Sequence, residues 1–257
     1  MEKRDLISGH IIRRYKRFLA DVELQDGSVI TAHTTNTGSM KTCWEPGDAV
    51  LLEHHDNPAR KLKYTWLACE RADTWVGVET GMPNRVVAEA ARNGTLPGLS
   101  DLVDVLTEQK YGAEQSRIDV LAKDPEGRRV YIEVKNTTLK LASYACFPDA
   151  VTVRGRKHLR ELRGMVDQGH RAAILFFIHR EDVTAFDVAR EIDPAYAAEL
   201  DLAVSAGVEV LPVAAKLIVK KQVNRLFTLR WELPGMLPWE RGRQSFTSPP
   251  LGWEAGR

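Results

Sequence analysis

A change of pattern at residues 81–84, Gly-Met-Pro-Asn, constrains the fold of this chain most. Before this point, stretches of alternating polar and apolar residues follow one another at short spacing, whereas after it strand-like stretches alternate with helix-like ones. Pro83 can begin a helix over residues 84–94, because proline is favoured in the first helical turn. The pattern therefore predicts two domains, over residues 1–80 and 81–233, the first built from strands and the second of the α/β type.

The strand-rich stretch is predicted to form a small closed barrel. Residues 14–24 and 28–35 alternate in polarity and are joined by Gln-Asp-Gly-Ser, a hairpin signal because glycine accepts positive φ. Three more strand-like stretches follow, over residues 48–56, 62–73 and 74–80. About five short strands without a helix are typical of the oligonucleotide/oligosaccharide-binding (OB) barrel. The prediction is an OB-like five-stranded β-barrel.

The α/β stretch is predicted to form a mixed central sheet with helices on both faces. Strand-like residues 116–123 and 129–136 flank a turn that contains Asp-Pro-Glu-Gly. A helix, an apolar strand, a second helix and a last strand follow, over residues 155–169, 171–179, 194–207 and 208–219. Residues 234–257 are rich in Pro, Gly and Arg without periodicity, which predicts a poorly ordered C-terminal tail.

Charge and hydropathy narrow the class of protein. No run of about 18 apolar residues occurs and the start lacks the apolar segment of a signal peptide, so we expect a cytoplasmic protein without a membrane partner. Three widely spaced cysteines predict reduced thiols, and nothing in the sequence specifies an oligomeric state. The net charge is only +1, yet basic residues outnumber acidic ones six to two in residues 1–20 and 151–171 and five to none in 214–230. Such clusters suit a polyphosphate partner, although a solvated face is their commoner explanation.

Two acids and a lysine fall close together on the predicted hairpin. Alternation along residues 130–135 puts Glu133 and Lys135 on one face, and a turn centred near residue 126 brings Asp119 opposite Glu133, roughly 5 Å away if both side chains share that face. Neighbouring carboxylates repel, and Mg²⁺ or Mn²⁺ would remove the conflict while the lysine orients or deprotonates a water. The set suits phosphodiester hydrolysis. A surface ion pair is the alternative.

Glu89, on the predicted first helix, is a candidate third acid for the metal, although an exposed helical glutamate is the commoner case. The order of helix, hairpin with Asp and Glu-x-Lys, helix and strand resembles the PD-(D/E)xK nuclease superfamily. More closely, the chain resembles the sugar fermentation stimulation protein A family. The stretches that carry this resemblance are spread over residues 14–212: RYKRFLADV, NTGSM, PNRVVAEA, SRIDVL, YIEVKNTTL, FPDAVTVRGRKHLREL and GVEVLP.

The resemblance implies an N-terminal barrel joined to a nuclease-like domain, with Asp119 and Glu133 binding metal and Lys135 serving the water. By analogy, cleavage would leave a 5′-phosphate and a 3′-hydroxyl. The family name also implies a rival function, a non-catalytic DNA-binding regulator of sugar (maltose) metabolism genes. One departure is visible at Thr34 and Thr35, where the family is expected to carry a Cys-Pro pair, so no role of that cysteine transfers to this chain.

Basic and small polar residues are predicted to contact nucleic acid, in the first place DNA. They come from the first barrel hairpin, the Asn-Thr-Gly-Ser-Met stretch and the start of the helix at 155–169. The candidates are Arg14, Lys16, Arg17, Asn36, Thr37, Ser39, Arg154, Lys157 and His158. A half-buried strand, a barrel turn and a solvated helix start are the structural alternatives for the three groups. Carbohydrate recognition by the barrel is a third function, with thin support because Trp44, Trp66 and Trp75 can all be barrel core.

Overall fold

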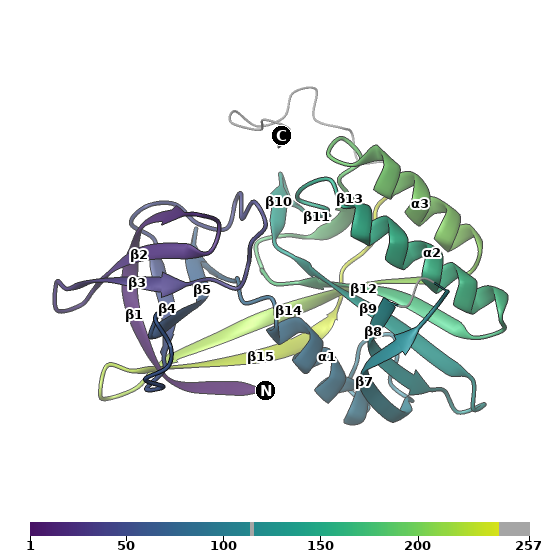
Figure 1. Cartoon of the computed structure of the whole chain (residues 1–257), viewed down its shortest axis with the longest axis horizontal. Coiled ribbons are helices and arrows are strands. Elements are labelled where there is room, and N and C mark those ends of the chain that lie inside the picture. Colours follow the sequence, from purple (N-terminus) through teal and green to yellow (C-terminus); the bar gives the residue numbers. More distant parts are fainter. Residues whose placement is uncertain (114–115, 242–257) are drawn as a thin grey trace.

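The N-terminal part of the computed structural model, which describes residues 1–113 and 116–241, is a closed five-stranded barrel (Figure 1). Its strands are β1 (Glu2–Tyr15), β2 (Leu19–Leu24), β3 (Val29–His33), β4 (Ala49–His54) and β5 (Tyr64–Arg71), and β6 (Thr74–Gly77) pairs with β5. The pairs run β1–β2–β3–β5–β4 and back to β1, and only β3 and β5 are parallel. The predicted OB-like barrel is confirmed.

The three tryptophans of the barrel region have different surroundings. Trp66 is fully buried in the barrel core, and Trp44 packs edge-on against it with ring centroids 6.1 Å apart. Trp75 is partly buried against the core that the barrel strands share with α1 and the sheet of the second domain. All three rings therefore fill structural positions, which leaves carbohydrate recognition by stacking tryptophans without support in this barrel.

The predicted strand over residues 14–24 is wrong because a turn divides it. β1 ends at Tyr15 and pairs back onto β2, with Tyr15 opposite Leu19. Lys16 and Arg17 both have positive φ, 48° and 66°, a conformation that non-glycine residues seldom adopt and that tight hairpins need. Nothing in the residue types signals this turn, whereas the predicted hairpin between β2 and β3, with Gly27 at φ 82°, is confirmed.

β1 also joins the two domains. Its first residues pair with β15, with Glu2 opposite Arg230, before the strand enters the barrel. One sheet of 12 strands consequently runs through the whole molecule. The barrel and the α/β domain are therefore connected by backbone hydrogen bonds as well as by the chain.

The second domain has a mixed sheet with helices on both faces, as predicted (Figure 1). Its path is β15 (Phe227–Met236), β14 (Glu209–Lys221), β12 (Arg171–Ile178), β9 (Arg129–Thr137), β8 (Ser116–Lys123) and β7 (Val103–Tyr111). β12 is parallel to β9 and β14, and the other neighbours are antiparallel. α1 (Met82–Arg92) covers one face, and α2 (Val153–Asp167) and α3 (Pro194–Ser205) cover the other.

Three parts of this domain differ from the sequence-based expectations. β7 was not predicted, and neither was the small sheet of β10 (Leu139–Leu141), β11 (Tyr144–Phe147) and β13 (Ala185–Val188). The predicted tail is wrong for residues 234–241, because β15 continues to Met236 and Trp239 bridges to Phe186. Residues 242–257 lie outside the described residues. Within the described part, no helix combines the length and apolar character that a membrane-spanning helix needs.

Candidate active site at the fork of strands β8 and β9

The register of the β8–β9 hairpin brings Asp119 next to Glu133, as predicted. The last backbone pair is Val120 with Ile132, and just beyond it the Asp119 carboxylate accepts a hydrogen bond from the Val134 amide at 2.7 Å. From this point β8 continues alongside β7 only. Asp119 therefore occupies the fork where one strand leaves its neighbour.

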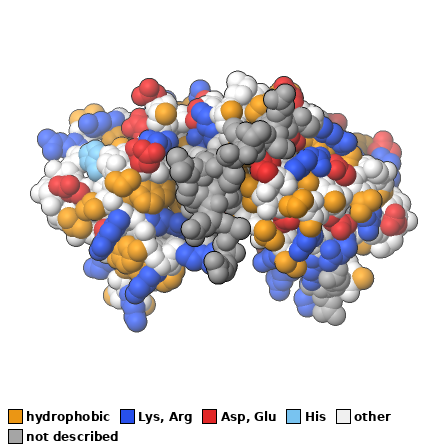
Figure 2. Space-filling model, turned by 90° about the horizontal axis from the view of Figure 1, so that it is seen from above, with side chains coloured by type: hydrophobic (Ala, Val, Ile, Leu, Met, Phe, Trp, Pro, Cys, Tyr) orange, Lys and Arg blue, Asp and Glu red, His pale blue; other side chains and the backbone are white. Residues whose placement is uncertain are grey.

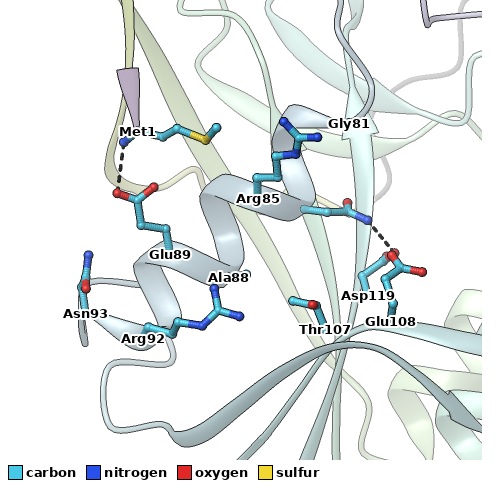
Figure 3. Close-up of a pocket in the computed structure, with 11 residues that line it drawn as sticks. Met1, Gly81, Arg85, Ala88, Glu89, Arg92, Asn93, Thr107, Glu108 and Asp119 are labelled. Atoms are coloured by element: carbon cyan, nitrogen blue, oxygen red, sulfur yellow. Dashed lines mark hydrogen bonds and ion pairs between the residues drawn. The ribbon is translucent and has the colours of Figure 1, made fainter. Parts of the chain in front are cut away.

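The expectation that the two acids share a face is not met. Val120 packs in the core under α1, whereas Ile118 packs under α2, so side-chain alternation is interrupted at Asp119. The Asp119 carboxylate turns toward α1, where Asn84 donates to it at 2.7 Å (Figure 3). Glu133 and Lys135 turn toward α2. The two acids nonetheless stay close enough for the charge of Glu133 to contribute to the raised pKa of Asp119.

Asp119 carries a strongly perturbed charge. Burial, and then repulsion from Glu133, raise the pKa of Asp119 to about 7, and the hydrogen bond from Val134 only partly opposes them. At neutral pH the side chain of Asp119 is consequently protonated in part of the molecules and ionised in the others. A carboxylate whose pKa is raised by a second acid is typical of sites that bind cations or transfer protons.

Glu133 and Lys135 form one cluster with His158 of α2. The Lys135 ammonium donates to Glu133 Oε1 at 2.7 Å and lies 3.3 Å from His158 Nδ1, which itself contacts Glu133 Oε1. The side chain of Glu133 is only 3% exposed. Burial acts to raise the pKa of Glu133, but Lys135 and His158 outweigh it and hold that pKa below its ordinary value. Glu133 is therefore an ionised carboxylate in a buried place.

The second carboxylate oxygen of Glu133 indicates that the fork can bind a cation. Oε2 is buried and has no hydrogen-bond partner among the described residues, and the hydroxyl of nearby Tyr111 is in the same state. Buried acceptors without partners are rare and call for an ion or water. The described residues hold no ready cluster of three His, Cys, Asp or Glu side chains for a metal. Two carboxylates are nonetheless enough for Mg²⁺, which usually keeps several waters and takes further oxygens from substrate phosphate.

Burial and the surrounding carboxylates raise the pKa of the Tyr111 hydroxyl, and Glu161 of α2 is one of the acids responsible. Glu161 is 5% exposed, and its side chain packs so closely on Gly112 that a Cβ there would come within 2.5 Å of it. Neither Tyr111 nor Glu161 was singled out from the sequence, because Tyr111 lies in a stretch without a clear pattern and Glu161 lies in a predicted helix that reads as ordinary structure.

Glu89 lies on the same pocket as Asp119 but is directed elsewhere. Its carboxylate is 3.4 Å from the amino group of Met1, and the side chain is 48% exposed (Figure 3). The acid beside Asp119 in this pocket is Glu108 of β7, which contributes to the raised pKa of Asp119. A ligand role for Glu89 stays a prediction.

Asp119 opens into a pocket of about 600 Å³ along α1. Arg85 and Arg92 stand seven residues apart on the exposed side of that helix and line the pocket with Asn84 and Asn93 (Figure 3). Two guanidinium groups in the same pocket as Asp119 could bind the phosphates of a polynucleotide. The sequence pattern did not identify these arginines, since they lie on the polar face of an amphipathic helix.

The Asn-Thr-Gly-Ser stretch forms a loop whose predicted contact residues are mostly engaged within the protein. Arg14 donates to the carbonyl oxygens of Asn36 and Gly38 at 3.0 and 2.9 Å. The Ser39 hydroxyl donates to Asp149 at 2.9 Å, which ties the barrel to the segment before α2. Asn36 is buried, and its side chain accepts from the Gly38 amide. These side chains shape the loop.

Other predicted contact residues are exposed. Lys16, Arg17 and Thr37 lie on the barrel surface, where Arg17 donates to the Thr37 carbonyl at 3.1 Å. Arg154 is exposed at the start of α2 and Lys157 is partly exposed one turn further on, whereas His158 is buried in the cluster described above. Lys and Arg side chains are spread over both domains on the face in Figure 2. Their contacts with nucleic acid stay predictions.

Comparisons with known proteins match both halves of the chain. A family model described as the SfsA N-terminal OB domain matches residues 12–78, and one described as the Sugar fermentation stimulation protein RE domain matches residues 81–221. Sugar fermentation stimulation protein homologs of Rhodospirillum rubrum and Geobacter sulfurreducens are each 50% identical, over 216 and 212 residues. These matches cover 80% and 82% of this chain and 88% and 90% of the relatives. The solved structure of Pyrococcus furiosus SfsA in complex with Ca²⁺ is 27% identical, with a TM-score of 0.76 over 93% of this chain and 98% of the other.

Proposed function

The chain belongs to the sugar fermentation stimulation protein family, and from this premise and the geometry of the fork we propose that it binds nucleic acid and hydrolyses phosphodiester bonds with a divalent cation. The observation that carries the proposal is the pair of neighbouring acids at the fork, Asp119 with a raised pKa and Glu133 with a buried, unpartnered oxygen. The family membership and the OB-plus-nuclease-like fold agree with the predictions from sequence.

Asp119 and Glu133 would hold the cation, and Mg²⁺ or Mn²⁺ is the proposed species because both favour oxygen ligands. The Ca²⁺ bound by the Pyrococcus furiosus relative supports a divalent ion in this family. When bound, the cation would neutralise charge that develops on the phosphate oxygens. Orienting the water and binding the substrate phosphates would be the task of side chains of this chain.

Lys135 is proposed to orient the attacking water, because its ammonium is held at 2.7 Å from Glu133 Oε1 at the edge of the cluster. The water oxygen forms a bond to phosphorus as the bond to the 3′-oxygen breaks, and the departing 3′-oxygen gains a proton. The products would be a 5′-phosphate and a 3′-hydroxyl end. Water supplies both the hydroxyl and the proton, so no further reactant is required.

The pocket along α1 is proposed to hold the strand that is cut. Arg85 and Arg92 would contact its phosphates, and the exposed Lys16, Arg17, Thr37 and Arg154 would extend the contact over the barrel and the start of α2. DNA is the partner proposed first. The engaged side chains of Arg14, Asn36 and Ser39 would support this surface without touching the substrate.

A cleavage assay tests the proposal. Labelled single- and double-stranded DNA and RNA are incubated with the protein, with and without Mg²⁺ or Mn²⁺, beside Asp119→Ala. Cation-dependent cleavage by the unaltered protein alone supports the nuclease. Salt-sensitive binding that Asp119→Ala leaves unchanged, without cleavage under any condition, would instead support the DNA-binding regulator.

Substitutions at Arg14 and Lys16 should distinguish an arginine that supports the loop from a lysine that binds phosphate. Lys16→Ala is expected to weaken DNA binding and to lower the slope of log affinity against log salt by about 1, without changing stability. Arg14→Ala is expected to cost about 2 kcal/mol of unfolding free energy, because four backbone carbonyl groups lose a charged donor. Urea melts and salt titrations measure the two effects. A fall in the salt slope with unchanged stability for Arg14→Ala would contradict its assignment to the loop.

A further inference from the structure

We infer that His158 is a positioning residue that fixes Glu133 Oε1, so that the other oxygen of the same carboxylate stays available to the cation. The inference rests on the proposed function, which it deepens by naming the group that aims the acid. His158 was expected to contact nucleic acid, and its burial at 4% exposure removes it from that surface.

The position of His158 is set by the start of α2. The Thr152 side chain caps the helix by accepting from the Gly155 amide at 3.0 Å, and the Thr152 amide donates to Asp193, itself the cap of α3, at 2.8 Å. Arg154 and His158 are four residues apart, so they lie on the same side of the helix. Arg154 Nε donates to His158 Nε2 at 3.2 Å.

The proton on the imidazole can be assigned from its partners. Arginine has donors only, so His158 Nε2 must be the acceptor and carries no proton in this contact. The ring proton of a neutral histidine then lies on Nδ1, because the carboxylate oxygen Glu133 Oε1 that Nδ1 contacts can only accept. The Lys135 ammonium, 3.3 Å from Nδ1, donates to Glu133 Oε1 at 2.7 Å and not to the ring. Arg154 thus selects the tautomer that donates to Glu133.

Glu133 Oε1 consequently receives two donors, His158 Nδ1 and the Lys135 ammonium. These bonds fix the plane of the carboxylate, since turning it away from Nδ1 and the ammonium would break both, whichever of the two equivalent oxygens accepts them. Oε2 is the oxygen left without a partner among the described residues. Removing a partner that orients a metal ligand in this way usually lowers metal affinity by roughly 10- to 100-fold.

Two amide substitutions at His158 distinguish the roles of its two ring nitrogens. The amide nitrogen in His158→Asn can take the place of Nδ1 and donate to Glu133, whereas the amide in His158→Gln reaches the place of Nε2 and can only satisfy Arg154. Binding of Mn²⁺ or Ca²⁺ alone is measured by calorimetry on the full chain without nucleic acid, with thermal melts to confirm folding. His10→Asn, on an exposed position of β1, is the matched control.

We expect His158→Gln to lose roughly tenfold or more in cation affinity, and His158→Asn to stay within about threefold of the unaltered protein. Equal losses in the two folded variants, or no loss in either, would overturn the positioning role while leaving the proposed function intact. If the unaltered protein binds no divalent cation, the proposed function fails, and the inference fails with it.

Discussion

Asp119→Asn is expected to make the cation-free protein more stable above neutral pH and to abolish cleavage. The raised pKa of Asp119, about 7, means that folding at higher pH places an ionised carboxylate where burial and Glu133 both oppose it. An amide carries no such charge. It can still accept from the Val134 amide, and its nitrogen can face the oxygen of Asn84 after that side chain flips.

The size and the sign of the stability change follow from linkage. The acid has a higher pKa when folded than when unfolded, so the unfolded chain releases its proton first and stability falls as pH rises from about 4 to about 7. A pKa moved from 3.8 to about 7 corresponds to about 4 kcal/mol. Because Asp119 is partly exposed to the pocket, about 2 kcal/mol is the expected gain of Asp119→Asn at about pH 8, and none is expected below about pH 4.

Urea melts at several pH values, with and without Mg²⁺, measure this effect. The cation should stabilise the unaltered protein and not the variant, so the order of stability reverses as the cation is added. Asp101→Asn, at an exposed carboxylate on the loop before β7, serves as the control and should show no gain at high pH. Equal stability of Asp119→Asn and the unaltered protein at about pH 8 would contradict a raised pKa of Asp119 in the folded protein.

The register of the hairpin was predictable because local residues determine it. The Asp124–Gly127 turn closes through the Gly127 amide, with Gly127 at φ 81°, and this fixes every pair along β8 and β9. Alternation then assigned Glu133 and Lys135 to one face. The same logic failed at Asp119, because beyond Val120 strand β8 pairs with β7 alone, and the exposed, charged residues of β7 gave no clear pattern.

Contacts between elements far apart in sequence could not be predicted from one sequence. His158 meets Glu133 across 25 residues, and Ser39 meets Asp149 across 110. Both depend on how α2 packs on the sheet and how the barrel is docked through β1. A sequence pattern indicates that a helix has an apolar face, but not which side chain at the edge of that face reaches a buried acid. For this reason His158 was assigned to nucleic acid and Arg14 to phosphate.

Lys135→Met is expected to separate cation binding from cleavage. The thioether keeps most of the apolar stem but removes the ammonium, so a water would lose the group proposed to orient or deprotonate it. Cleavage should fall by roughly 100- to 1,000-fold, within the range found for general acid–base groups. Cation binding should persist, because Asp119 and Glu133 remain and a neighbouring positive charge is gone. Single-turnover cleavage and calorimetry measure the two effects.

The same substitution should change the response of stability to the cation. Without Lys135, Glu133 keeps only His158 to oppose its burial, so the pKa of Glu133 rises and the cation-free variant loses about 1–2 kcal/mol of unfolding free energy, below the range for a fully buried pair because Lys135 is 13% exposed. Mg²⁺ should then restore more stability to Lys135→Met than it adds to the unaltered protein. Lys123→Met is the matched control, since that lysine pairs with Asp104 on the exposed side of β8. Cleavage by Lys135→Met within about threefold of the unaltered rate would exclude Lys135 from the reaction, since loss of a general acid–base group costs far more.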